Sequence, residues 1–179
     1  DGHLYYYPKA SISYRLTNPM ASIDEMKLRL AYGASGNEPN YGQRFTPLNA
    51  FTNTRGLPGL VVNGVTGTSL RPERQTEIEA GVDATLFRER ASLEFTVYQK
   101  NISDLLLQRA LAPSSGFVTE VFNGGKMRTR GVEIALGLVP WRTSRFDWML
   151  RTTFSATRST VTELPVPAFL NGGFGTSIG

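Results

Sequence analysis

The stretch that decides the fold is Met26-Lys27-Leu28-Arg29-Leu30-Ala31-Tyr32-Gly33. Large apolar side chains stand at every even position of this stretch, and charged or small ones stand at every odd position. Successive side chains of a β-strand point to opposite faces, so the stretch has one apolar and one polar face. An α-helix would need apolar residues three and four positions apart, which the stretch does not supply. The sequence therefore predicts a β-strand here.

The same two-residue period recurs along the chain, and several of the segments run to about ten residues. That length suits a tilted membrane-spanning strand and exceeds the usual five or six residues of a strand. A shorter apolar run at 105–107 either starts another strand or caps the preceding one. The five further predicted strands lie at residues 12–16, 78–86, 91–98, 132–138 and 147–157.

The connections between these strands alternate between short and long. The links at 87–90 and 139–145 are short and the one at 17–25 is modest, whereas about forty residues separate 34 from 74 and about thirty separate 101 from 130. Outer-membrane barrels combine short periplasmic turns with long external loops in this way. A soluble antiparallel β-sandwich also shows strict alternation and stays open as an alternative. The pattern favours an all-β, antiparallel, partial transmembrane barrel over residues 1–179.

Composition excludes several classes of protein. The chain has no cysteine and a single histidine, His3, so it cannot build a cysteine-ligated or multi-histidine metal site. His3 lies near the end of the chain and is expected to be inert, not part of a Ser-His-Asp triad. No window offers the roughly 18 consecutive apolar residues of a membrane-spanning helix. The net charge is +4, but the basic residues are mostly scattered and not gathered in a nucleic-acid-binding patch. We therefore expect no enzyme activity, no cofactor, no metal and no nucleic acid partner.

Aromatic residues gather at two of the short turns. Trp141, Phe146 and Trp148 surround one turn, and Phe87 lies at another. In outer-membrane barrels such residues form a girdle at the membrane edge, which is the role predicted for them here. The alternative is that they are ordinary hairpin aromatics.

The polar faces of the predicted strands carry charges of both signs, as the wall of a watery lumen would. Carboxylates at these positions could also suggest general acid catalysis, but cross-strand charge pairing explains them without any chemistry. The cluster of Lys126, Arg128 and Arg130 shares its parity with apolar Val132. It either stands above the apolar band, or a bulge at Gly131 resets the register. The residues predicted to face the lumen are Lys27, Arg29, Glu77, Glu79, Asp83, Glu94 and Arg151.

Four motifs, in order and with family-like spacing, resemble those of SusC/RagA-type TonB-dependent outer-membrane transporters. The polar pair that usually follows "GK" in that family is here Arg128 and Thr129, and residues 38–69 have no counterpart. The motifs are Tyr32-Gly33-Ala34-Ser35-Gly36-Asn37; Leu70-Arg71-Pro72-Glu73 with Thr76-Glu77 and Gly81-Val82-Asp83; Tyr98-Gln99-Lys100 with Asp104-Leu105-Leu106-Leu107; and Asn123-Gly124-Gly125-Lys126 with Gly131-Val132-Glu133.

The resemblance implies a bacterial outer-membrane barrel of about 22 strands, of which this chain supplies six to eight. It further implies a plug and a TonB-contacting segment outside this sequence, import of a glycan- or peptide-like nutrient, and a possible SusD-like lipoprotein partner. The first seven residues lack the features of a signal peptide, and the chain is expected to be a fragment truncated at both ends.

Within that family the external loop at residues 38–69 is the candidate for contact with substrate or partner, through Tyr41, Phe45 and Phe51. Two other functions stay open at this point. One is a different outer-membrane barrel, such as a siderophore receptor or an adhesin translocator, and the other is a soluble β-sandwich binding module.

Overall fold

The computed structural model of the chain describes residues 4–40, 45, 48–53, 55–62, 64–66 and 70–165. The chain divides into two units, which are described separately. The first unit comprises Asp1–Ser35, Thr76–Asn101 and Arg128–Thr160, and the second comprises Gly36–Gln75, Ile102–Met127 and Val161–Gly179.

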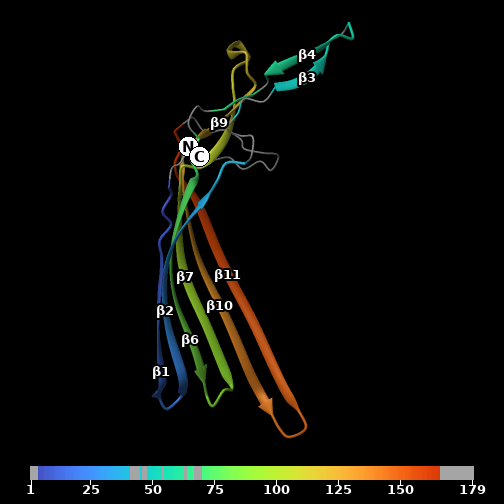
Figure 1. Cartoon of the computed structure of the whole chain (residues 1–179). Coiled ribbons are helices and arrows are strands. Elements are labelled where there is room, and N and C mark those ends of the chain that lie inside the picture. The colour runs from blue at the N-terminus through green and yellow to red at the C-terminus, as the bar shows by residue number, and fades with distance from the viewer. Residues whose placement is uncertain are drawn as a thin grey trace. The chain divides into compact units, whose positions relative to one another are not determined.

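Six long strands form one sheet in the order β1-β2-β6-β7-β10-β11, and Figure 1 shows them side by side. Each strand neighbours the next long strand along the chain, so no connection crosses another. All six predicted strands are confirmed. The strands are β1 (Lys9–Met20), β2 (Ile23–Asn37), β6 (Glu73–Leu86), β7 (Ala91–Ser103), β10 (Lys126–Arg142) and β11 (Asp147–Glu163).

The strands are 12 to 17 residues long, which exceeds the nine to eleven residues that a tilted strand needs to cross a bilayer. Tight turns join them in pairs at one end, and the turn between β1 and β2 is only Ala21-Ser22. In the turn between β6 and β7, Phe87, Arg88 and Glu89 all have φ between 57° and 62°. Residues other than glycine rarely adopt that left-handed region, because their Cβ atom clashes with the backbone. The Asp24 carboxylate helps to stabilise the turn by accepting a hydrogen bond from Glu89 N at 3.0 Å.

The pairing of β1 with β2 gathers apolar side chains on one face of the sheet. Ile12 lies opposite Leu30 and Tyr14 lies opposite Leu28, and all four side chains are exposed. Among the described residues the buried large or small hydrophobic side chains are only Ala34 and Val139 in the first unit and Leu70 and Leu107 in the second. A soluble sandwich would bury this face against a second sheet, so the fold is instead an arc of a barrel wall.

The long connections contain structure that the alternation did not predict. In the second unit β3 (Leu48–Thr52) pairs with β4 (Pro58–Val62), and a three-stranded sheet has the order β5-β9-β8. Of the apolar run at 105–107, Leu106 and Leu107 begin a separate strand, β8, so the run starts another strand and does not cap β7. The described residues contain no helix long and apolar enough to cross a membrane. The remaining elements are β5 (Gly64–Thr66), β8 (Leu106–Ala110), η1 (Pro113–Ser115) and β9 (Thr119–Asn123).

Candidate functional site

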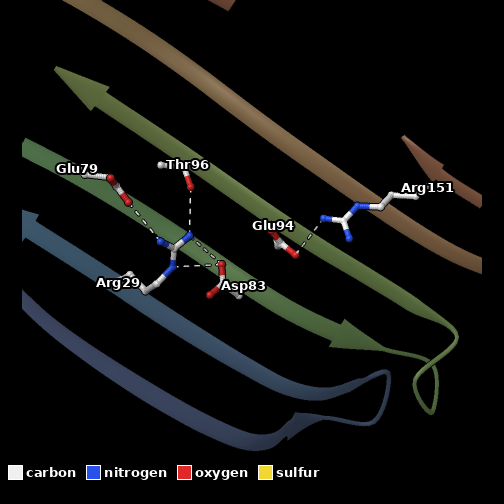
Figure 2. Close-up of polar contacts among 6 residues, drawn as sticks. All are labelled: Arg29, Glu79, Asp83, Glu94, Thr96 and Arg151. Atoms are coloured by element: carbon white, nitrogen blue, oxygen red, sulfur yellow. Dashed lines mark hydrogen bonds and ion pairs between the residues drawn. The ribbon is translucent and has the colours of Figure 1, made fainter. Parts of the chain in front are cut away.

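Arg29 on β2 is the centre of a charged network on the polar face of the first unit. Its guanidinium donates to Asp83 Oδ1 from Nη2 at 2.9 Å and from Nε at 3.2 Å, and Nη1 donates to Glu79 Oε1 at 3.2 Å. Nη2 also donates to Thr96 Oγ1 on β7 at 3.1 Å. Figure 2 shows the guanidinium lying over β6, with carboxylates on two sides. One cation therefore joins three strands and neutralises part of the charge of two carboxylates.

Gly81 makes room for this arrangement. A Cβ atom at Gly81 would lie 2.8 Å from Arg29 Nη2 and 3.2 Å from the carbonyl oxygen of Phe95. The guanidinium can therefore cross β6 to reach Thr96 only because position 81 has no side chain. Parity alone predicts that Gly81 and Thr96 share this face, but the sequence gives no sign that Arg29 would pass over the glycine.

Of the four remaining predicted lumen residues, three have an ion-pair partner and Lys27 has none among the described residues. Lys100 Nζ lies 3.4 Å from Glu77 Oε2, and Arg151 Nη2 lies 3.9 Å from Glu94 Oε1 (Figure 2 shows the second pair). Lys27 makes no hydrogen bond or ion pair with any residue that the structure describes, and it stands opposite Arg15 in the register. Charge pairing between strands thus holds for six of the seven residues and not for Lys27.

Tyr98 on β7 forms a second crossing of the same kind. A Cβ at Gly131 of β10 would clash with Tyr98 Cζ, Oη and Cε1, and the Tyr98 hydroxyl lies 2.9 Å from Thr157 Oγ1 on β11. The Tyr98 side chain therefore passes over Gly131 and reaches from β7 to β11. Any side chain at position 131 would displace it.

The register through Gly131 is continuous, which decides between the two alternatives for the nearby basic cluster. Arg128 Nε donates to Asn101 Oδ1 at 3.1 Å, and nine residues further along both strands Gly137 approaches the Ser92 side chain. No residue is inserted between these contacts, so no bulge resets the register. Arg128 and its neighbour Arg130, which donates to Gln99 Oε1 at 2.8 Å, stay on the face of Val132.

A hollow of about 200 Å³ opens on the polar face between β7, β10 and β11. Ala135 contributes a small side chain to its lining, and Glu94 and Glu133 each bring a carboxylate. Thr96, Thr153 and Ser155 add three hydroxyl groups. Parity alone places Glu133 on this face, but its position on β10 relative to the neighbouring strands, and so its place in the hollow, is not visible in the sequence.

The chemistry available on this face is hydrogen bonding and charge, distributed over many strands. Within the described residues no group of three or more histidines and carboxylates could hold a metal ion. The Arg29 network and the two further ion pairs are about a third or more exposed, as expected of groups in contact with water. The face therefore offers hydrogen bonds and charges of both signs at many points along the sheet.

The predicted external contact residues belong to the second unit. Phe51 on β3 is 47% exposed, and its ring edge approaches Gly59 on β4, where a Cβ would lie 2.7 Å away. Phe45 is 70% exposed, and Tyr41 lies outside the described residues. Leu48 and Leu60, both more than 60% exposed, add apolar surface to the same hairpin.

Comparison with known proteins agrees with this architecture. Residues 2–175 match the model of the family described as TonB dependent receptor-like, beta-barrel. TonB-dependent receptor P26 of Formosa agariphila is 25% identical over 173 residues, which cover 92% of this chain and 18% of that protein. TonB-dependent receptor P39 of the same organism is 29% identical over 163 residues, which cover 85% of this chain and 15% of that protein. The chain thus spans less than a fifth of the length of these relatives.

Solved structures show the same fold. The RagAB peptide importer in its closed-closed state matches with a TM-score of 0.82 at 21% identity, over 96% of this chain and 20% of that one. The open-open state of the same importer matches with a TM-score of 0.77, also at 21% identity and with the same coverage. The resemblance that the four motifs carry is thereby confirmed, and the chain belongs to the TonB-dependent receptor-like β-barrel family.

Proposed function

We propose that this chain is part of the wall of an outer-membrane, TonB-dependent nutrient importer, with its polar face lining the lumen. The observation that carries the proposal is the contrast between the two faces of one sheet. One face carries the Arg29 network and its neighbouring ion pairs, and the other exposes Leu28, Leu30 and Phe154 without any cover. A wall between lipid and water needs this division.

The substrate we propose is a bulky polar nutrient of the glycan or peptide class. A lumen wall with both signs of charge and many hydroxyl groups offers hydrogen bonds to either class without fixing one. The solved importers of the same fold are described as peptide importers, which supports the peptide class. In this role the chain does no covalent chemistry, and TonB acts on parts of the protein outside this sequence.

The long connection between β2 and β6 is the proposed contact with substrate or with a SusD-like surface lipoprotein. Its β3–β4 hairpin exposes Leu48 and Leu60 on one face and Phe51 on the other, and a two-stranded hairpin has no second layer to cover either face. Exposed aromatic side chains of this kind commonly anchor protein interfaces.

Replacing residues 48–62 with a short Gly-Ser linker is expected to lower energised uptake of labelled peptides or oligosaccharides by about tenfold, the effect of losing an interface anchor. The full-length protein should still assemble, because within the described part of the chain β3 and β4 pair with each other and with none of the long strands. Uptake by whole cells, with folded barrel measured by heat-modifiable gel migration, checks both expectations.

Phe51→Ser is the point variant for the same test, and Asn49→Ser, two residues earlier on the same face of β3, is its control. A strain without the gene tests the import function itself, since it should lose the protonophore-sensitive part of the uptake. Unchanged uptake and lipoprotein retention in the linker variant would show that the hairpin contacts neither.

A further inference from the structure

In the second unit, the Asn123 side chain at the end of β9 forms hydrogen bonds with two segments next to the long strands, one at Arg71 and one at Asp104. Its Nδ2 donates to the carbonyl oxygens of Arg71, at 2.8 Å, and Asp104, at 2.9 Å. Its Oδ1 accepts from Arg71 N at 2.6 Å. One amide therefore satisfies three backbone groups on two segments that are more than 30 residues apart in the sequence.

Glu73, the first residue of β6, also joins two segments, through the two oxygens of its carboxylate. Its Oε1 accepts from Leu106 N at 2.8 Å, and its Oε2 accepts from Asn37 Nδ2 at 2.9 Å. The two oxygens thus hold the start of β8 and the end of β2. Leu106 N lies next to the Asp104–Leu105 corner, so both side chains act on the same junction.

The junction joins the four sequence motifs of the family resemblance. Asn37 ends the first motif, Arg71 and Glu73 belong to the second, Asp104 and Leu106 to the third, and Asn123 to the fourth. Asp104 has φ 56°, an unfavourable conformation for a residue other than glycine, and its carbonyl is held by Asn123. The motifs therefore have a shared structural role that sequence spacing did not reveal.

Neither side chain is replaceable by a close relative. Aspartate at position 123 would keep one acceptor for Arg71 N but would bring a negative oxygen toward two carbonyl oxygens in place of two donors. At position 73 only a carboxylate offers two acceptor oxygens at this reach. Removing Asn123 leaves three backbone groups without these partners, and removing Glu73 does the same to Leu106 N and the Asn37 amide.

We propose that Glu73 and Asn123 are positioning residues for import, forming a clasp that fixes the two long connections, 38–72 and 104–125, in one shared arrangement. The clasp contacts no substrate; it acts through the loops that do. This inference rests on the proposed function only for its effect on uptake, because the arrangement of the loops can be measured separately.

The test uses the full-length protein in its outer membrane, with the variants Glu73→Ala, Asn123→Asp and their combination. Trypsin cleavage after Arg55, which lies between β3 and β4, reports on the 38–72 loop in intact cells. Each single variant is expected to raise the cleavage rate and to lower uptake per folded barrel by about tenfold, the effect of losing two or three hydrogen bonds. Because both substitutions open the same clasp, the double variant should be no worse than the stronger single one.

Two matched controls lie outside the clasp. Glu120→Ala removes the partner of Arg109, 2.6 Å away within the same unit, and Asn101→Asp keeps the acceptor that Arg128 uses. Both should leave cleavage and uptake unchanged. Asn37→Ala, which removes a single bond to Glu73, should give a partial effect and serves if the stronger variants fold poorly.

The clasp is overturned if cleavage is unchanged in Glu73→Ala and Asn123→Asp, or if their effects add as independent lesions. It is also overturned as a positioning device if the loss of uptake only matches the loss of folded barrel. Absence of energised uptake in the unmodified protein would instead overturn the proposed function, while the cleavage measurements would still decide on the clasp.

Discussion

Phe154→Lys is expected to prevent most of the full-length protein from accumulating as a folded barrel in the outer membrane. Phe154 is 58% exposed on the apolar face and lies near the middle of the 17-residue strand β11. A lysine at the bilayer midplane costs a barrel roughly 2–4 kcal/mol, a large part of the stability of an ordinary protein. The folded fraction, measured by heat-modifiable migration of outer-membrane extracts, checks this.

Thr153→Lys is the matched control, because it changes the adjacent residue to the same side chain. Thr153 lines the polar hollow together with Glu94 and Glu133, so the new ammonium group would meet carboxylates and water. Its folded fraction should stay close to that of the unmodified protein. Equal sensitivity at the two positions would mean that the faces of β11 do not differ in environment.

Arg29→Met is expected to lower the free energy of unfolding of the barrel by about 1–3 kcal/mol. The change leaves Glu79 and Asp83 close together without the cation that joined them, and removes the link to Thr96. Losing one partner of a fully buried pair costs about 3–5 kcal/mol, and the smaller figure applies here because these groups are about a third exposed. The midpoint of thermal or urea unfolding in detergent measures the change.

Lys27→Met is the control for Arg29→Met, since Lys27 lies two residues earlier on the same face and has no ionic partner among the described residues. It should change the midpoint little. Adding Asp83→Asn to Arg29→Met should recover part of the loss, because one of the two stranded charges is removed. If Arg29→Met and Lys27→Met gave the same midpoint, the network around Arg29 would not stabilise the wall.

The faces of the strands were predictable from the sequence because a two-residue period survives in each strand. Leu28 and Leu30 fall on the apolar face and Arg29 on the polar one, as their alternation requires. The short turns were predictable as well, since Phe87–Arg90 separates two strands whose pattern is unmistakable. The local pattern of apolar and polar residues is therefore enough to predict the long strands, their faces and the short turns between them.

The partners of the charges were not predictable, because parity gives the face of a residue and not its height relative to the next strand. Glu77 pairs with Lys100 and not with Lys27 on the strand before, although all three share a face. The crossing of Tyr98 over Gly131 and the clasp at Asn123 depend on contacts between residues far apart in the chain. Such contacts follow from register, which no single segment encodes.

A spin-label scan of β11 would test whether the strands separate lipid from water. The chain contains no cysteine, so single cysteines can be placed along Asp147–Glu163 of the full-length protein in lipid bilayers once any others are removed. We expect a two-residue period in collision with oxygen, with maxima at Leu150 and Phe154, and opposite maxima in collision with a water-soluble nickel chelate at Thr153 and Ser155. Equal nickel accessibility on both faces, or no two-residue period, would show that β11 does not separate lipid from water.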